Sequence, residues 1–317
     1  MRLIYASIFS LLVVTVAEAL MESPVGFVGL GIMGKGMAQN LLKKGVASKL
    51  VVWNRSPDAS AELSAAFPGS VEVAATAGEV IQRCDVTFSM LSTQEASVAV
   101  FDCPAEAGGV VASVTPGKCI VDCATLSPER MQSIAAAVEA RGGRFLEAPV
   151  SGSKVPAETG TLIFLCGGEQ ALYDKVTPAL QAMGKANFLF GPVGGGSKMK
   201  LIVNGLMGTM MGAFAESMAL CSAADLPQDL LLQVLDLGAM ANPMFKGKGP
   251  NMINKTYAPH FPLKHAQKDM RLALALASDL GVSLPTTDAA NQQFLSVLDE
   301  RGDEDFSAVY AAAAAKK

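Results

Sequence analysis

Three glycines near the start of the chain have the spacing of a phosphate-binding turn. They lie where a short apolar run, residues 25–30, is succeeded by an apolar-periodic segment, residues 33–44. Between a strand and a helix, the first glycine allows a tight turn, the second lets the backbone approach a pyrophosphate, and the third brings helix and strand together. The helix N-terminus offers N–H groups to the phosphates. The pattern predicts a dinucleotide site made by Gly29, Leu30, Gly31, Ile32, Met33 and Gly34.

The end of the next apolar run, residues 49–54, bears on the choice of dinucleotide. NAD sites usually place a carboxylate there, about twenty residues after the glycines, to bind the ribose hydroxyls. This chain instead has Asn54, Arg55 and Ser56. Arg55 can pair with a 2′-phosphate, and Asn54 or Ser56 can add donors. We therefore predict NADP(H) in preference to NAD(H). The alternative is that Arg55 is an ordinary solvated side chain.

A nicotinamide cofactor carries a hydride, so reduction of a carbonyl also needs a group that protonates the oxygen. Both histidines, His260 and His265, lie outside the dinucleotide-binding half, which makes lysine the candidate. Lys200 and Asn204 are four residues apart and share a helix face, whereas Lys198 points roughly 200° away from Lys200. Burial disfavours the charged form of a lysine, so a buried Lys200 could act as an acid near neutral pH. The alternative is that Lys200 extends into solvent.

The composition favours a globular α/β enzyme of two domains. The chain has 317 residues, of which half are hydrophobic and 17% are charged, and its net charge is −4. This charge leaves no basic surface to attract nucleic acid. The six cysteines form no CxxC pair and the two histidines lie far from any cysteine or acidic cluster, so we expect no metal site.

The first 21 residues differ from the rest. Arg2 precedes an apolar run, residues 3–16, and Ala17-Glu18-Ala19 resembles a signal-peptidase site. The run is too short for a comfortable membrane span, so we expect none in the mature enzyme. The segment predicts targeting to the secretory pathway or to an organelle, plastid or mitochondrion. If translation starts at Met21, the protein is cytoplasmic.

Short apolar runs alternate with helical or turn-rich stretches up to residue 190, which predicts a doubly wound parallel sheet covered by helices on both faces. Besides residues 25–30 and 49–54, the apolar runs are residues 85–91, 119–122, 145–148, 161–166 and 188–190. We predict a Rossmann domain over residues 22–192 and an all-helical domain over residues 193–317. Within the second domain, residues 196–224 are long and apolar enough for a buried helix, and residues 242–262 are expected to form a loop rich in Pro, Gly, Asn and Lys.

Four segments resemble the signatures of the β-hydroxyacid dehydrogenases, a family related to 3-hydroxyisobutyrate dehydrogenase. They read GFVGLGIMGKGMAQNL, DCATLSP, EAPVSGSKVPAETGTL and GSKMKLIVN. Within this family the chain is most similar to the glyoxylate/succinic semialdehyde reductases, through VWNRSP, LDLGAMANPMFKGKGPNM and FPLKHAQKDMRLALAL. The resemblance implies a Rossmann domain joined by a long helix to a helical domain, with the active site in the cleft between the two domains.

The resemblance also implies roles for individual residues. Lys200 corresponds to the family's catalytic lysine and Asn204 to the asparagine beside it. Ser151 and Gly152 correspond to the pair that anchors the substrate carboxylate. The remaining positions are Thr125 beside cofactor and substrate, Lys268 at the cofactor, and Phe261 and Asp269 at the substrate. The family's DxST segment reads Asp122-Cys123-Ala124-Thr125 here, which leaves a role for position 124 in doubt.

The expected reaction is the NADPH-dependent reduction of glyoxylate to glycolate and of succinic semialdehyde to 4-hydroxybutyrate, so the expected substrates are small aldehyde acids. Oxidation of 3-hydroxyisobutyrate or a related hydroxyacid with NAD is the alternative within the same chemistry. An alternative of another class is a non-catalytic NADPH-binding module. The apolar helical domain predicts a homo-oligomer.

Overall fold

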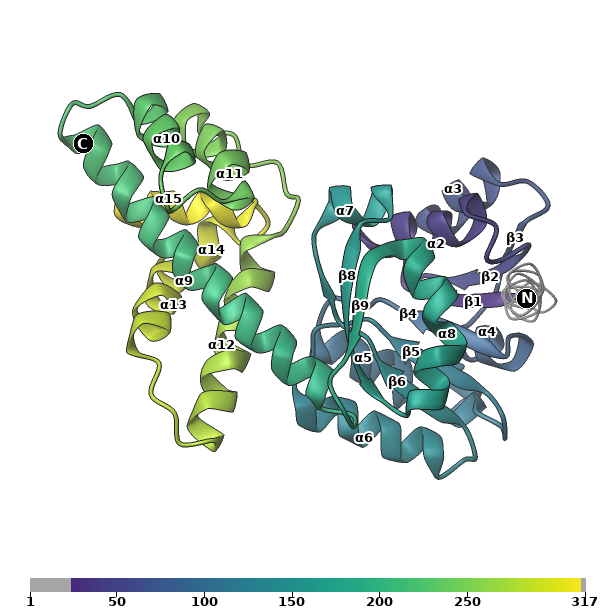
Figure 1. Ribbon diagram of the computed structural model, residues 1–317. Coiled ribbons are helices and arrows are strands. Elements are labelled where there is room, and N and C mark those ends of the chain that lie inside the picture. The colour runs from purple at the N-terminus through teal and green to yellow at the C-terminus, as the bar shows by residue number, and fades with distance from the viewer. Residues whose placement is uncertain (1–23, 315–317) are drawn as a thin grey trace, which may run out of the picture. The chain divides into compact units, whose positions relative to one another are not determined.

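The computed structural model describes residues 24–314, and these form two compact units (Figure 1). The first unit ends at Lys200 and the second begins at Leu201. The predicted targeting segment, residues 1–21, lies outside the described residues. The predicted domain limits at residues 22, 192 and 193 remain predictions.

The described residues of the first unit form a nine-stranded sheet. Its order is β3-β2-β1-β4-β5-β6-β8-β7, with β9 paired to β8. The order reverses between β1 and β4, and ligands of open α/β sheets bind outside the carboxyl ends of the strands at such a point. The strands are β1 Val25–Val28, β2 Leu50–Trp53, β3 Val71–Val73, β4 Val86–Ser89, β5 Cys119–Asp122, β6 Arg144–Glu147, β7 Val150–Ser151, β8 Leu162–Gly168 and β9 Gly184–Leu189.

The predicted parallel sheet is confirmed for most of its strands, but the pairing is mixed at one end. Strands β1 to β6 pair in parallel, but β8 runs antiparallel to both β6 and β7. Parallel pairing requires a crossover of a dozen or more residues, usually with a long helix. Between β7 and β8 the chain forms only the six-residue helix α7, Lys154–Thr159, so it turns back. The short strands β3 and β7 were not predicted.

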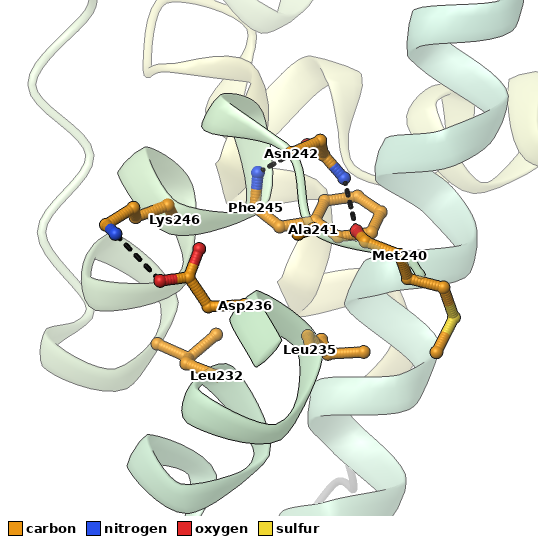
Figure 2. A pocket seen from close by; sticks show the side chains of 8 residues that line it. All are labelled: Leu232, Leu235, Asp236, Met240, Ala241, Asn242, Phe245 and Lys246. Carbon is orange, nitrogen blue, oxygen red and sulfur yellow. Dashed lines mark hydrogen bonds and ion pairs between the residues drawn. The ribbon is translucent and has the colours of Figure 1, made fainter. Parts of the chain in front are cut away.

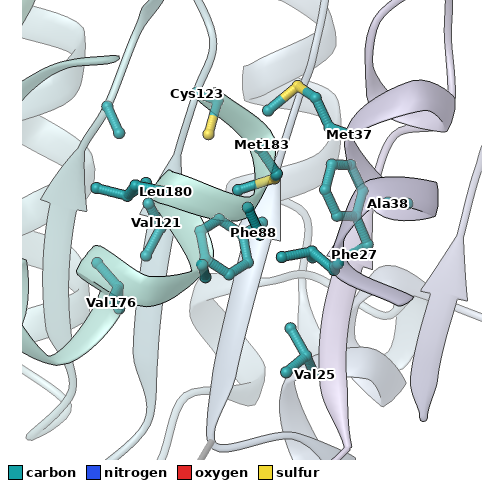
Figure 3. Close-up of a cluster of buried hydrophobic side chains, with 14 of the residues drawn as sticks. Val25, Phe27, Met37, Ala38, Phe88, Val121, Cys123, Val176, Leu180 and Met183 are labelled. Atoms are coloured by element: carbon teal, nitrogen blue, oxygen red, sulfur yellow. The ribbon is translucent and has the colours of Figure 1, made fainter. Parts of the chain in front are cut away.

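Helices cover both faces of this sheet because neighbouring strand residues point to opposite sides. Phe27 belongs to one core and Val28 to the other. Figure 3 shows the first core, where Phe27 and Phe88 stack with ring centroids 6.4 Å apart beside Met37 of α2 and Val176 of α8. Besides α7, the helices packed on this sheet are α2 Gly34–Lys43, α3 Pro57–Ala66, α4 Ala77–Arg83, α5 Gln94–Phe101, α6 Pro128–Glu139 and α8 Gln170–Met183, with the short 3₁₀ turns η1 Ala105–Ala107 and η2 Val111–Ser113.

The second unit is all helical over its described residues. Its core gathers long apolar side chains, including Phe214, Met218, Met270 and Phe294. Helix α9, Gly195–Ala223, begins in the first unit and continues into this one. The other helices are α10 Gln228–Leu237, α11 Pro243–Asn254, α12 Leu263–Asp279, α13 Pro285–Ser296, α14 Leu298–Arg301, η3 Phe306–Val309 and α15 Tyr310–Ala313.

The expectation that α9 is buried all round is wrong. One face packs into the core through residues such as Leu201 and Met211, but Ile202, Leu206 and Leu220 on the opposite face are more than 60% exposed. Apolar side chains are distributed around this helix, so its composition gives little contrast between the two faces. Contacts with the other elements decide which face is covered.

The predicted loop over residues 242–262 is mostly helix α11. Asn242 caps this helix by accepting a hydrogen bond from the Phe245 N–H at 2.9 Å, and Pro243 occupies the first turn, where a missing N–H costs nothing. Figure 2 shows this cap and the Lys246–Asp236 ion pair, 2.7 Å, between α11 and α10. A Cβ on Gly249 would lie 2.4 Å from Leu232, so this glycine permits close helix packing. The sequence predicts a loop here because Pro, Gly and Asn usually interrupt helices. In this segment the same residue types cap the helix and let it pack closely against α10.

Candidate active site

The glycine turn has the geometry that the sequence predicts. Gly29 has a φ of +93°, in the region that favours glycine, and a Cβ there would lie 2.5 Å from the Met90 carbonyl oxygen. A Cβ on Gly34 would lie 2.0 Å from the Gly29 carbonyl oxygen, so the start of α2 meets the end of β1 closely. A Cβ on Gly31 would have no described heavy atom within 4 Å. Its backbone is thus accessible, as a pyrophosphate site requires.

The start of α2 can receive an anion. Among the described residues, no side chain caps this helix at Met33, and its first turn contains no acidic residue. The first N–H groups of the helix therefore keep their capacity to bind phosphate oxygens, and the helix dipole favours a negative charge there. The residues present fit a dinucleotide pyrophosphate.

Asn54 joins the glycine turn to the end of β2. Its Oδ1 accepts a hydrogen bond from the Leu30 N–H at 2.8 Å, and its Nδ2 donates to the Ser56 carbonyl oxygen at 2.9 Å. The next two residues in the chain, Arg55 and Ser56, are exposed. The asparagine thus holds the turn, whereas the Arg55 guanidinium faces solvent at the same strand end, where it can meet a 2′-phosphate.

The end of β5 holds a buried carboxylate. Asp122 Oδ1 accepts hydrogen bonds from Ser89 Oγ at 2.9 Å and from the Ala124 N–H at 3.1 Å. Burial raises the pKa of Asp122 to about 6. The Ala124 side chain lies in the second apolar core, so this position faces the protein interior, and a serine hydroxyl there would need a buried partner. Thr125, the next residue, is partly exposed.

Ser151 and Gly152 follow β6 at the same edge of the sheet. Ser151 ends β7 opposite Ile163, and Gly152 has a φ of +132°. A Cβ on Gly152 would lie 2.7 Å from Leu162, so position 152 requires glycine for conformation and for space. The next helix, α7, is fastened to α2 by Asn40 Nδ2, which donates to the Ala157 carbonyl oxygen at 2.7 Å. The predicted anchor therefore leads directly into a helix that packs against the predicted cofactor helix.

The first turns of α9 place the two candidate lysines differently. The Lys200 residue is 5% exposed, whereas Lys198 is exposed. This difference follows from their positions around the helix. It disagrees with the alternative in which Lys200 extends into solvent.

The second unit brings three predicted residues together around one carboxylate. Asp269 Oδ2 accepts a hydrogen bond from Asn204 Nδ2 at 2.6 Å, and Asp269 Oδ1 pairs with Lys268 Nζ at 2.9 Å. Asn204 and Asp269 are both buried. The carboxylate ties α12 to α9 and orients the asparagine four residues after Lys200.

Phe261 lies apart from this carboxylate, just before α12. Its ring packs edge-to-face against Phe306 at 5.5 Å, and its N–H donates to Asp305 Oδ2 at 3.3 Å. Asp305 is fully buried and also accepts from Lys248 Nζ at 2.7 Å. Burial alone would raise the pKa of Asp305, but hydrogen bonds from Lys248 and Ser307 outweigh it and lower this pKa.

Three residues with buried polar contacts were not predicted from the sequence: Glu147, Asp305 and Lys248. Glu147 ends a strand of the parallel sheet, a position that commonly faces a site, and this signal was available. Asp305 and Lys248 are 57 residues apart, so their pairing could not be predicted from spacing.

The described residues contain no cluster of three or more His, Cys, Asp or Glu side chains that could hold a metal ion. Burial lowers the pKa of His265, the histidine nearest to Asp269 in the chain. No helix in the described part of the chain is long and apolar enough to cross a bilayer.

Comparison with known proteins assigns the family. The family model for the NAD-binding domain of 6-phosphogluconate dehydrogenase matches residues 24–194. Residues 194–313 match the model named NAD-binding of NADP-dependent 3-hydroxyisobutyrate dehydrogenase. The chain belongs to the β-hydroxyacid dehydrogenase family. As a member of it, the protein is an oxidoreductase that uses NADP(H), and its sequence and fold support β-hydroxyacid dehydrogenase activity.

Individual relatives agree with this family assignment. This dehydrogenase is 49% identical to glyoxylate/succinic semialdehyde reductase 1 of Arabidopsis thaliana over 91% of this chain and 97% of that protein. It is 44% identical to the chloroplastic glyoxylate/succinic semialdehyde reductase 2 of the same plant, over 92% and 80%. A crystal structure of 3-hydroxyisobutyrate dehydrogenase from Salmonella typhimurium has a TM-score of 0.81 at 31% identity, covering 91% of this chain and 99% of that one.

The exposed guanidinium at the end of β2 gives a testable prediction. Replacing Arg55 with alanine should raise the KM for NADPH about tenfold or more, because charge-assisted hydrogen bonds to the 2′-phosphate are lost. The KM for NADH should change less than twofold. Steady-state kinetics with both cofactors measure the difference.

Lys49→Ala is the matched control, because Lys49 is an exposed cation beside the opposite end of β2. It should leave both KM values unchanged. Equal effects of the two substitutions on NADPH would contradict a specific role for Arg55.

Proposed function

We propose that this dehydrogenase reduces glyoxylate to glycolate and succinic semialdehyde to 4-hydroxybutyrate with NADPH, and that Lys200 is the general acid. The observation that carries the proposal is the burial of Lys200 on the helix face that also holds Asn204, with Asn204 itself fastened by Asp269. A buried lysine beside an oriented amide can donate a proton at a defined place. The names of the two Arabidopsis relatives support this choice of substrates.

The proposed roles of the residues follow from their chemistry. The Ser151 hydroxyl and the Gly152 N–H bind the substrate carboxylate, which both substrates carry. When bound, NADPH supplies a hydride to the carbonyl carbon. Lys200 gives its proton to the carbonyl oxygen, so that the product is the alcohol. Thr125, Lys268, Phe261 and Asp269 retain the cofactor and substrate roles predicted from the resemblance.

A turnover assay tests the substrate class. Purified protein with NADPH should reduce glyoxylate and succinic semialdehyde, and a matched aldehyde without a carboxylate, such as propanal, should react at least about tenfold more slowly in kcat/KM because the anchor is unused. Equal rates for propanal would contradict a carboxylate anchor.

Oxidation of 3-hydroxyisobutyrate is the second candidate, since the second family model and the Salmonella structure carry that name. The absence of a carboxylate at the end of β2, where Asn54, Arg55 and Ser56 stand, disfavours NAD as its cofactor. The same assay distinguishes the two candidates when 3-hydroxyisobutyrate and NAD are added to the panel. Faster turnover of that pair than of glyoxylate with NADPH would reverse the assignment.

Lys200 and Lys198 provide a matched pair of variants for the proton donor. Lys200→Ala should lower kcat by roughly a hundredfold or more, as loss of a general acid does, while NADPH still binds. Lys198→Ala should leave kcat within about twofold because its side chain is exposed on another face. Similar kinetics for the two variants would show that Lys200 is not the donor.

We also propose that the protein is a homo-oligomer. Leu230, Val234 and Leu237 form a stripe on α10 that is at least half exposed, with Leu237 at 90%. Such stripes are usually covered by a partner. Light scattering should give a mass above one chain, and Leu237→Lys should lower it, whereas Leu280→Lys, an exposed site after α12, should not. A monomeric mass for the unaltered protein would refute the proposal.

Residues 1–21 are proposed as a targeting segment. N-terminal sequencing of the native protein tests this proposal: cleavage at the Ala17-Glu18-Ala19 site should leave Leu20 as the first residue, whereas a first residue at Met1 would contradict removal of the segment.

A further inference from the structure

Glu147 is a fully buried carboxylate at a junction between two parts of the candidate site. It is the last residue of β6 and pairs in register with Asp122 of β5. Four residues later the chain reaches Ser151, the proposed substrate anchor. The position of the Glu147 backbone is therefore set by the sheet, and the anchor segment continues directly from it.

The side chain of Glu147 reaches a segment 47 residues further along the chain. Its Oε1 accepts hydrogen bonds from the Gly194 N–H at 2.6 Å and the Gly196 N–H at 2.8 Å. Its Oε2 accepts from Ser197 Oγ at 2.5 Å. Gly194 directly precedes α9, and Gly196 and Ser197 belong to its first turn, which is followed by Lys200. One carboxylate thus satisfies N–H groups that a helix start leaves without an intrahelical partner.

The glycines around the carboxylate allow this close approach. A Cβ on Gly196 would lie 2.2 Å from the Leu165 carbonyl oxygen, and a Cβ on Gly167 would lie 2.3 Å from Glu147 Oε1. The start of α9 therefore lies directly against β8, and the Glu147 carboxylate lies beside Gly167 of that strand. A longer or shorter side chain at position 147 could not make the same three contacts.

The electrostatics favour a carboxylate at this place, although burial is costly. Burial raises the pKa of Glu147, and the hydrogen bonds from Ser197, Gly194 and Gly196 oppose that change. A helix N-terminus stabilises a negative charge, and hydrogen bonds to a charged acceptor are stronger than neutral ones. Removing the acceptor would leave buried donors without a partner.

We propose that Glu147 is a positioning residue for the reduction: it fixes the first turn of α9, and with it Lys200, relative to Ser151 and Gly152. The inference rests on the proposed roles of these three residues. Since Glu147 touches the helix start and leads into the anchor, it determines the separation between the proton donor and the bound carboxylate. Small displacements of such groups slow a reaction severely.

Kinetics of Glu147→Ala and Glu147→Gln test the proposal. The alanine variant should lower kcat with glyoxylate by about tenfold or more, because Lys200 is displaced, while the Kd of NADPH stays within twofold. The glutamine variant should recover most of that loss, because its amide oxygen still accepts from the two glycine N–H groups. Hydrogen exchange at residues 194–197 should be faster in the alanine variant and near normal in the glutamine variant.

Thr76→Ala is the control for general destabilisation. Thr76 caps α4 by accepting from the Glu79 N–H, and it is absent from the candidate site, so its loss should lower Tm without lowering kcat. If Glu147→Ala does not fold, Ser197→Ala carries the test, since it removes one of the three contacts and should lower kcat while NADPH binding persists.

The possible outcomes separate this inference from the proposed function. If Lys200→Ala is inactive but Glu147→Ala keeps kcat within twofold, the positioning role is refuted. If Glu147→Ala lowers NADPH affinity and kcat in parallel and glutamine restores neither, the residue is only structural and the inference also fails. If Lys200→Ala retains full activity, the proposed function fails, and the hydrogen-exchange result then decides whether Glu147 holds α9.

Discussion

The candidate site depends on one geometrical constraint: the carboxyl ends of parallel strands meet at one edge of a sheet. The glycine turn follows β1, Asn54 and Arg55 follow β2, Thr125 follows β5, and Ser151 comes soon after β6. The first and last of these residues, Gly29 and Ser151, are 122 positions apart in the chain, yet parallel pairing brings each of them to the same edge. The loops at this edge can therefore supply the groups that bind ligands, while the strands behind them form the packed core.

Buried carboxylates connect these loops to the rest of the fold. Asp122 organises the turn after β5, and Glu147 holds the start of α9. Each carboxylate loses hydration when buried, and each is stabilised in return by donors from backbone N–H groups and serine hydroxyls. In the second unit, the buried Asp269 carboxylate accepts a hydrogen bond from Asn204 and forms an ion pair with Lys268. The functional loops are thus positioned by directional polar contacts as well as by the apolar cores.

Much of the fold and of the site could be predicted because local patterns determine them. The strands β1, β2, β4 and β5 were expected within about two residues, since apolar runs between helical stretches indicate buried strands. The errors have physical causes as well. Asn242 and Pro243 suggested a loop but form a helix cap, and α9 looked uniformly buried because its apolar composition gives no contrast between its faces.

The amino-acid sequence by itself determined the dinucleotide-binding turn, the lack of a carboxylate at the end of β2 and the shared face of Lys200 and Asn204. These features depend on residues close together in the chain, where backbone conformation and helical period decide the geometry. Only the tertiary structure decided that β8 runs antiparallel, that Asn204 is held by Asp269 and that Glu147 caps α9. Those contacts join residues 20 to 65 positions apart, and no local pattern encodes which distant groups meet when the chain packs.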